Sequence, residues 1–438
     1  MKNSISKLYI KYVSQNILGM IGISLYILAD TFFIAKAVGS DGITALNLVL
    51  PLYSLIFAIG CMIGIGSAIR YSIGKNKKDM DNVSYFFNAI FWGTIIGIIF
   101  SLMGIFCSGK IVSIMGGDAH IVEVGKDYTL IFMLFAPCFI WNHICNAFVR
   151  NDGSPSIAMI ATLFSSLFNI VFDYILMFPC NMGMKGAALA TALSPVMGVG
   201  ICCIHFFSEK NNIVFKFSKP SVKTLISSCK IGVSAFVGEI SSGVITMVFN
   251  ILILDLTGNV GVAAYGVVAN ISLVAVSVFN GVAQGSQPLL SEYYGKNDRK
   301  SVRKIRNMGI ATAAVLGVII LTGIWMYTKG IVNIFNSEQD KQLEKLAVEG
   351  MRLYFMGFLF AGINIVCSSF FSATDYATWA FLTSVVRGFV AIIICAVVMS
   401  ELMGMRGVWL AFPTAELITL CISITGMFCT YEKNNRSQ

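Results

Sequence analysis

Twelve apolar runs, each close to the length needed to cross a lipid bilayer as a helix, divide the chain. About 20 mostly apolar residues suffice for one crossing. The runs lie near residues 12–37, 43–73, 85–107, 128–149, 156–178, 186–207, 224–255, 262–294, 308–328, 347–373, 377–400 and 407–430. Only 12% of the residues are charged, whereas a soluble domain has about 25%. The sequence therefore predicts an all-α integral membrane protein with twelve transmembrane helices and little chain left for a soluble domain.

Lysine and arginine are concentrated in one of the two sets of alternate loops. Of the 31 basic residues, most fall in this set, among them Lys2, Lys7, Lys11, Arg70, Lys75, Lys77, Lys78, Arg150, Lys210, Lys216, Lys219, Lys223 and Lys230, six residues of 296–306, Lys433 and Arg436. The positive-inside rule then predicts that both termini are cytoplasmic, as an even number of spans requires. These residues are interpreted as topology anchors, and not as a nucleic-acid surface.

The two halves of the chain repeat one another. The segment MGMKGAALA (182–190) recurs as MGMRGVWLA (403–411), and IGKN (73–76) recurs as YGKN (294–297) at the same offset of 221 residues. Gly60 and Gly64 match Gly281 and Gly285 at that offset as well. Several matches in one register indicate a duplication.

Each repeat holds six spans, so both repeats enter the membrane in the same orientation and form a parallel repeat. We expect two pseudo-symmetric six-helix bundles: an N-lobe (1–207), a cytoplasmic linker (208–223) and a C-lobe (224–438). Two such lobes can rock about a site between them, as alternating access requires. No GxxxxGK[ST] phosphate loop occurs, which favours an ion gradient as the energy source, and no HExxH or GxSxG motif suggests an enzyme. No cofactor is expected.

Four polar residues of the N-lobe fall at a common depth. A charged side chain at a helix centre costs about 2.5–3.5 kcal/mol on insertion scales, so such residues usually serve function. Asn169 and Asp173 are one helical turn apart. At 1.5 Å per residue, Asp30, Asp173 and Thr191 each lie roughly 8–10 Å from the outer ends of their spans. The set Asp30, Asn169, Asp173 and Thr191 is therefore predicted to bind a coupling cation, Na⁺ or H⁺, since carboxylate, amide and hydroxyl oxygens suit hard cations.

Structural alternatives exist for three members of this set. Thr191 could be a packing hydroxyl, Asn169 could bridge two helices, and Asp30 could pair with Lys36 at the membrane edge. Asp173 is the hardest of the four to explain by structure alone. The shared depth is the argument for treating them together.

The C-lobe does not copy these residues, because Val390 stands where the repeat would place Asn169. It has its own polar residues inside predicted spans, and these are predicted to line a substrate cavity: Glu239, Gln284, Gln287, Arg387 and Glu416. Glu239 could attract a cationic substrate. An Arg–Glu ion pair that stabilises the lobe is the alternative, and Gly281 with Gly285 has the GxxxG spacing of close helix packing.

In order along the chain, several segments resemble the multidrug and toxic compound extrusion (MATE) family. They are ADTFFIAKAVG (29–39), NIVFDYILM followed by GAALAT, GEISSG (238–243), FNGVAQGSQPLLSEYYGKN (279–297) and GMRGVWLAFPTAE (404–416). The fourth segment is the most specific and resembles the DinF-type bacterial branch. The resemblance covers nearly the whole chain.

The resemblance implies a multidrug efflux antiporter that exports organic cations in exchange for Na⁺ or H⁺ by alternating access. It places Asp30, Asn169, Asp173 and Thr191 on the family's N-lobe cation site and Glu239 on its seventh-helix acidic position. It also implies a bacterial cell membrane location, and a monomer is expected. The main alternative is a flippase for lipid-linked sugars, which would need several cationic residues in its cavity. An intramembrane enzyme or a channel fits the residues less well.

Overall fold

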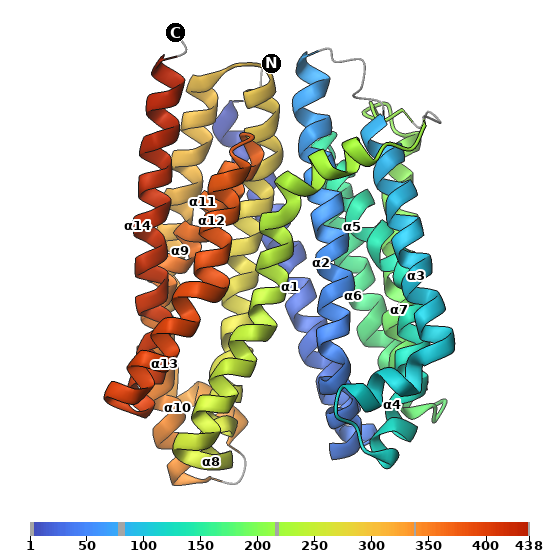
Figure 1. Cartoon of the computed structure of the whole chain (residues 1–438), viewed down its shortest axis with the longest axis vertical. Helices are drawn as coiled ribbons and strands as arrows, with labels where there is room; N and C mark the ends of the chain where they lie inside the picture. The colour runs from blue at the N-terminus through green and yellow to red at the C-terminus, as the bar shows by residue number, and fades with distance from the viewer. Residues whose placement is uncertain (1–3, 78–83, 215–218, 337–338, 437–438) are drawn as a thin grey trace.

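A computed structural model describes residues 4–77, 84–214, 219–336 and 339–436, and within these ranges it has helices and no strand (Figure 1). The first half of the chain forms seven α-helices and a 3₁₀ turn. Their bounds are α1 (Ile5–Ala37), α2 (Ser40–Lys77), α3 (Ser84–Ile114), α4 (Ala119–Leu134), α5 (Ala136–Asn151), α6 (Pro155–Met177), α7 (Gly183–Cys203) and η2 (Ile204–Phe207).

The second half begins with α8 (Val222–Gly295), a 74-residue element made of two helices that meet at a kink at Gly258, whose φ of 67° is left-handed. Its two arms are separate spans, because a straight helix of this length would be more than three times as long as a bilayer core is thick. The remaining elements are α9 (Arg299–Phe335), α10 (Lys341–Tyr354), η3 (Phe355–Gly357), α11 (Phe358–Ala373), α12 (Ala377–Val385), η4 (Val386–Val390), α13 (Ala391–Met403) and α14 (Met405–Arg436).

The predicted number of spans follows from these helices. Ten helical stretches within the described residues are long and apolar enough to cross a membrane, and α4 with α5, bent by 46°, can form one more. Division of α8 at Gly258 brings the total to twelve. The sequence-based prediction of an all-helical protein with twelve spans in two bundles is confirmed.

Matching irregularities in the two halves reflect the repeat. The fourth span breaks at Phe135, between α4 and α5, and the tenth breaks at Phe355–Gly357, at the repeat offset. In each half a glycine on the third helix of the lobe contacts the backbone beside the break. A Cβ on Gly97 would lie 2.6 Å from the Pro137 Cα, and one on Gly317 would lie 2.7 Å from the Phe358 carbonyl oxygen.

Both chain termini lie at the same end of the molecule, at the top of Figure 1. We call this end of the molecule the terminal end; the start of α1 and both ends of α8 lie there. The other end of the molecule is called the opposite end. That the terminal end is cytoplasmic remains a prediction, as do the lobe boundaries at 207 and 224. Three of the basic residues on which the prediction of a cytoplasmic terminal end depends, Lys2, Lys78 and Lys216, lie outside the described residues. Part of the predicted linker does as well.

The two lobes meet in the terminal half of the bundle along two glycine-lined crossings. On the first arm of α8, a Cβ on Gly232 would lie 1.9 Å from the Met62 carbonyl oxygen of α2. On the second arm, a Cβ on Gly281 would lie 2.5 Å from the Ile17 Cα of α1, and one on Gly285 would lie 2.7 Å from the Val13 Cα. Because only glycine permits such backbone approach, these crossings hold the lobes together at this end.

Beyond the crossings, the facing sides of α2 and α8 become exposed. Glu239, Ser242 and Thr246 follow Gly232 by 7, 10 and 14 residues and therefore lie on the same face of α8. Glu239 is half-buried there, while Ser242 and Thr246 are exposed. On α2 the matching face includes Pro51, which is exposed. The exposure of both faces indicates that the lobes diverge toward the opposite end.

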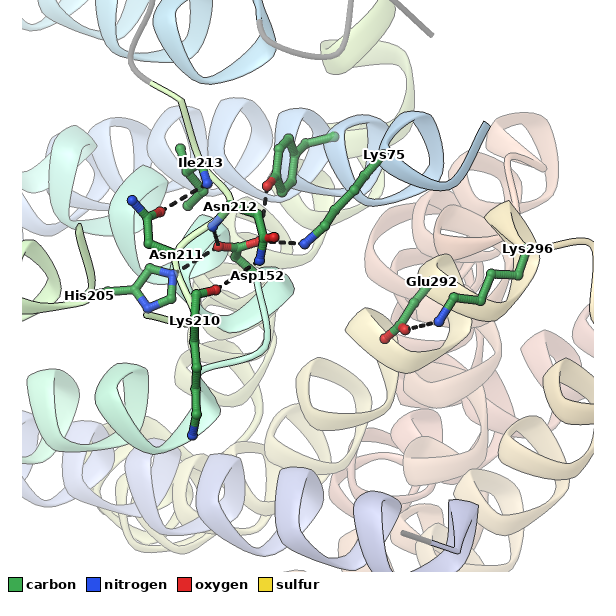
Figure 2. A network of polar contacts seen from close by, with 10 residues as sticks. Lys75, Asp152, His205, Lys210, Asn211, Asn212, Ile213, Glu292 and Lys296 are labelled. Atoms are coloured by element: carbon green, nitrogen blue, oxygen red, sulfur yellow. Dashed lines mark hydrogen bonds and ion pairs between the residues drawn. The ribbon is translucent and has the colours of Figure 1, made fainter. Parts of the chain in front are cut away.

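Asp152 directly follows the last residue of α5, and its side chain anchors the start of the segment that leads to the C-lobe (Figure 2). It accepts hydrogen bonds from Lys75 Nζ (2.8 Å), Tyr71 (2.9 Å) and the Asn212 backbone N–H (2.6 Å), and its other contact is His205 Nε2 (3.0 Å). Burial alone would raise the pKa of Asp152, but the hydrogen bonds from His205, Asn212 and Lys75 outweigh it and hold that pKa below its usual range. The ionised carboxylate therefore stabilises this corner of the N-lobe.

We expect Asp152→Asn to lower the free energy of unfolding by about 2 kcal/mol at neutral pH, because hydrogen bonds to charged groups are worth about 1.5–3 kcal/mol. The folded-state pKa is depressed, so the stabilisation is present above the pKa of an unfolded aspartate, about 3.9, and is lost as pH falls through the folded-state value. Thermal unfolding in detergent at several pH values measures both. Glu123→Gln, which removes an exposed pair with Lys126, is the control, and an Asp152→Asn deficit that persists unchanged in acid would contradict the assignment.

Candidate functional site

The four polar residues predicted for cation coupling come together inside the N-lobe. Helix α6 begins at Pro155 and presents Asn169 and Asp173, one turn apart, on a fully buried face. Asn169 Nδ2 donates to Thr191 Oγ1 of α7 at 3.3 Å. The carboxyl groups of Asp30 on α1 and Asp173 are within hydrogen-bonding reach of each other. Asp30 therefore interacts with Asp173, and no Asp30–Lys36 pair is found in the described part of the chain.

Three tyrosines complete this group, and the sequence analysis did not include them. Tyr128 of α4 hydrogen-bonds Thr191, and its hydroxyl lies within electrostatic reach of Asp30 and Asp173. Tyr26 lies one turn before Asp30 on α1, and its hydroxyl is 3.0 Å from that of Tyr53 on α2. The i, i+4 spacing of Tyr26 and Asp30 was a usable signal, but Tyr128 is one of 15 tyrosines in a chain rich in aromatic residues.

The chemistry of this group follows from its oxygen atoms. Five helices (α1, α2, α4, α6 and α7) direct carboxyl, amide or hydroxyl groups to one region. Two ionised carboxylates so close repel each other strongly, so the Asp30–Asp173 pair is favoured when a proton or a small cation lies between them. Carboxylate, carbonyl and hydroxyl oxygens are the ligands that hard cations take. The group can therefore bind a proton or a cation such as Na⁺.

The C-lobe has a separate ionic network on α14. Glu416 is buried, and its two carboxylate oxygens bind different partners: Arg387 Nε at 2.7 Å and Asn364 Nδ2 at 2.8 Å. Ser423 in turn donates to Asn364 Oδ1 at 3.0 Å. Arg387 lies in the π-helical turn η4, where a Cβ on Gly388 would lie 2.4 Å from that of Ser241. This matches the ion-pair alternative raised from the sequence.

Replacing one member of the Arg387–Glu416 pair should destabilise the protein more than replacing both. We expect Glu416→Leu or Arg387→Leu to cost about 3–5 kcal/mol, because each leaves a buried charge without its partner. The double variant should be more stable than either single one, since replacing a buried pair by apolar residues is often nearly neutral. Thermal unfolding of the four proteins in detergent tests this. Additive losses in the double variant would contradict the pairing.

The other residues predicted for the cavity lie in two places. Glu239 is half-buried on the facing side of α8, within electrostatic reach of the Tyr26 hydroxyl, as are Asp30 and Asp173. Gln284 and Gln287 instead lie near the α1–α8 crossing, where they bind Arg150 and Asn151. The structure thus separates Glu239, the glutamine pair and the Arg387–Glu416 pair into three locations, and none of their predicted roles has been tested.

Two six-helix lobes that meet at one end, with buried acidic residues in the first lobe, define the class of protein as a multi-pass membrane transporter. The family model described as MatE matches residues 16–175 and 235–397. The chain belongs to this family, and the resemblance seen in the sequence is confirmed.

Among relatives, the chain is 28% identical to the multidrug export protein MepA of Staphylococcus haemolyticus and 26% identical to that of Staphylococcus saprophyticus. Each alignment covers 99% of this chain and 95% of the relative. Among solved structures, it resembles an outward-facing multidrug resistance MATE transporter of the MOP superfamily, with a TM-score of 0.92 at 18% identity, covering 99% of this chain and 98% of the other. A MOP superfamily transporter from Pyrococcus furiosus gives a TM-score of 0.87 at 19% identity, covering 96% and 95%. These two likenesses show the shared fold.

Proposed function

We propose that this chain is a secondary active multidrug antiporter that exports organic cations in exchange for Na⁺ or H⁺. The observation behind the proposal is the contact between Asp30 and Asp173 inside the N-lobe. A carboxyl pair that requires a proton or cation between its members is suited to take up an ion in one state and release it in another. The names of the MepA relatives, multidrug export proteins, support the efflux direction.

The organic cation is proposed to bind between the lobes, near Glu239. This carboxylate is half-buried on a face of α8 that is exposed further along, at Ser242 and Thr246. The Tyr26 hydroxyl is common to the two acidic regions, because it is within electrostatic reach of Asp30, Asp173 and Glu239. Uptake of a cation by the carboxyl pair would change the field at Glu239 and the packing of α1, α6 and α7.

Exchange requires that each ligand prefer a different arrangement of the lobes. A ligand with equal affinity for both arrangements shifts nothing. In the proposed cycle, ion binding favours the arrangement that releases the organic cation, and substrate binding at the other side favours the return. Such coupling energies are typically about 1–3 kcal/mol.

The flippase alternative is less well supported by the described residues. Recognition of a pyrophosphate would need unoccupied basic side chains inside the lobes. Two arginines inside the described lobes already have partners: Arg150, buried in the last turn of α5, binds Gln284 and Asn16, and the half-buried Arg387 binds Glu416.

The proposal is tested by ethidium transport in everted membrane vesicles under an imposed Na⁺ or H⁺ gradient. We expect ethidium to accumulate inside the vesicles with at least one of the two gradients. This accumulation should stop when that gradient is collapsed. Vesicles without the protein supply the background. No response to either gradient would contradict the antiporter.

A further inference from the structure

Three consecutive residues at the end of α5, Arg150, Asn151 and Asp152, bind three different parts of the molecule. Asp152 holds α2 and the segment at Asn212, as described above. Arg150 Nη1 donates to Gln284 Oε1 of α8 at 2.7 Å and to Asn16 Oδ1 of α1 at 3.1 Å. Asn151 and Gln287 exchange two hydrogen bonds, of 3.0 and 3.2 Å. Two of the three residues thus bridge the N-lobe and the C-lobe.

These bridges lie at the α1–α8 crossing. Gln284 stands between Gly281 and Gly285, the two glycines that contact α1 backbone at Ile17 and Val13. The hydrogen bonds can therefore form only when the lobes are in contact at the terminal end. They report on, and stabilise, one of the two lobe arrangements.

The charge of Arg150 is unusual for a permanent structural link. The side chain is buried, yet its partners in the described structure are neutral amides, and its Nε is buried with no hydrogen-bond partner there. A buried charge without a carboxylate partner is costly. Its position in the last turn of α5 recovers part of that cost, because a helix C-terminus favours cations. Separation of the lobes would let water solvate the guanidinium, which makes the link reversible.

We propose that Arg150 and Asn151 form a reversible latch with Gln284 and Gln287 that sets the balance between the closed and open arrangements of the terminal end. Arg150 is a positioning residue in this assignment and does not contact the transported ion or substrate. The assignment of a role in transport rests on the proposed antiporter function, but the latch itself is a statement about the two lobe arrangements.

Two substitutions of Gln284 should move the balance in opposite directions. Gln284→Ala removes a hydrogen bond to a charged group, and such bonds are worth enough to shift an equilibrium by about tenfold or more. Gln284→Glu replaces the neutral partner by a carboxylate, which should hold the closed arrangement more tightly. Hydrogen–deuterium exchange of the purified protein, followed in peptides from 224–236 and 281–291, reports the opening of the two crossings independently of transport.

The expected result is faster exchange at both crossings for Gln284→Ala and slower exchange for Gln284→Glu, each by about tenfold, relative to the unchanged chain. Gln287→Ala, at the other bridge, should also speed exchange, which keeps the test valid if a Gln284 variant fails to fold. Gln15→Ala is the matched control, because Gln15 lies beside Asn16 but binds Ser156 within the N-lobe at 2.9 Å; it should leave exchange at the crossings unchanged.

Gln284 variants that exchange like the Gln15→Ala control, or that both move in one direction, would overturn the latch. Ethidium transport by the same variants separates this result from the proposed function. Opposite shifts in exchange with no ion-driven transport by any protein, including the unchanged chain, would support the latch and contradict the antiporter. Ion-driven transport with no shift in hydrogen–deuterium exchange would support the antiporter and contradict the latch.

Discussion

Asp173→Asn should reduce ion-driven ethidium transport to the background of vesicles that lack the protein. The amide has nearly the shape of the carboxylate and can donate a hydrogen bond to Asp30, so the pair no longer needs a proton or cation between its members. Loss of a coupling free energy of about 1–3 kcal/mol corresponds to a factor of about 5–150. The initial rate of transport under the effective gradient measures the loss.

The matched control is Asp127→Asn. Asp127 lies on α4, which belongs to the N-lobe as α6 does, and it precedes Tyr128 in sequence. Its side chain is 33% exposed and pairs with the exposed Lys185 at 3.2 Å. Exposed pairs contribute about 1 kcal/mol or less, so this variant should transport normally. Normal transport by Asp173→Asn, at equal amounts of folded protein, would reject the role assigned to the carboxyl pair.

Gly232→Ala is expected to have the second largest effect. A Cβ at this position would lie 1.9 Å from the Met62 carbonyl oxygen, so α2 and the first arm of α8 could not approach as they do. The closed arrangement of the terminal end would be lost, and with it the alternation between two lobe arrangements. We expect ethidium transport near background, even though alanine favours helix over glycine by about 1 kcal/mol.

Gly266→Ala on the second arm of α8 serves as the control, because nothing lies within 4 Å of a Cβ placed there. It makes the same chemical change in the same helix without a collision, and transport should be retained. If Gly232→Ala transports as well as Gly266→Ala, the close crossing is not required for the cycle.

The apolar runs were sufficient to predict the fold, because crossing a bilayer depends on local composition. The irregularities were not predictable in this way. The turn between the seventh and eighth spans is a single left-handed residue, Gly258, with helix directly before and after it, where a loop was expected. Helix α9 begins at Arg299, well before the predicted 308, because a charged segment can remain helical outside lipid. The break at Phe135 comes two residues before Pro137, which stands in the first turn of α5 and cannot continue the helix of α4.

The site was predictable only where depth in the membrane could be counted from sequence. That argument identified Asp30, Asn169, Asp173 and Thr191, which the structure brings together. It could not identify Tyr128, whose relation to Thr191 is set by helix packing. It also counted Arg150 among the loop anchors, whereas the structure buries it in the last turn of α5. Its partner Gln284 is 134 residues away, and no local pattern specifies such a contact.

Release of bound ethidium by the coupling cation tests the central claim most directly. Purified protein is equilibrated with ethidium, and its fluorescence is followed as Na⁺ is raised at fixed pH, or as pH is lowered at fixed Na⁺, with choline holding the ionic strength constant. At least one of the two cations should release ethidium from the unchanged chain and fail to release it from Asp173→Asn. Equal release from both proteins, or no release by either cation, would contradict a cation site at Asp30 and Asp173 that governs the substrate.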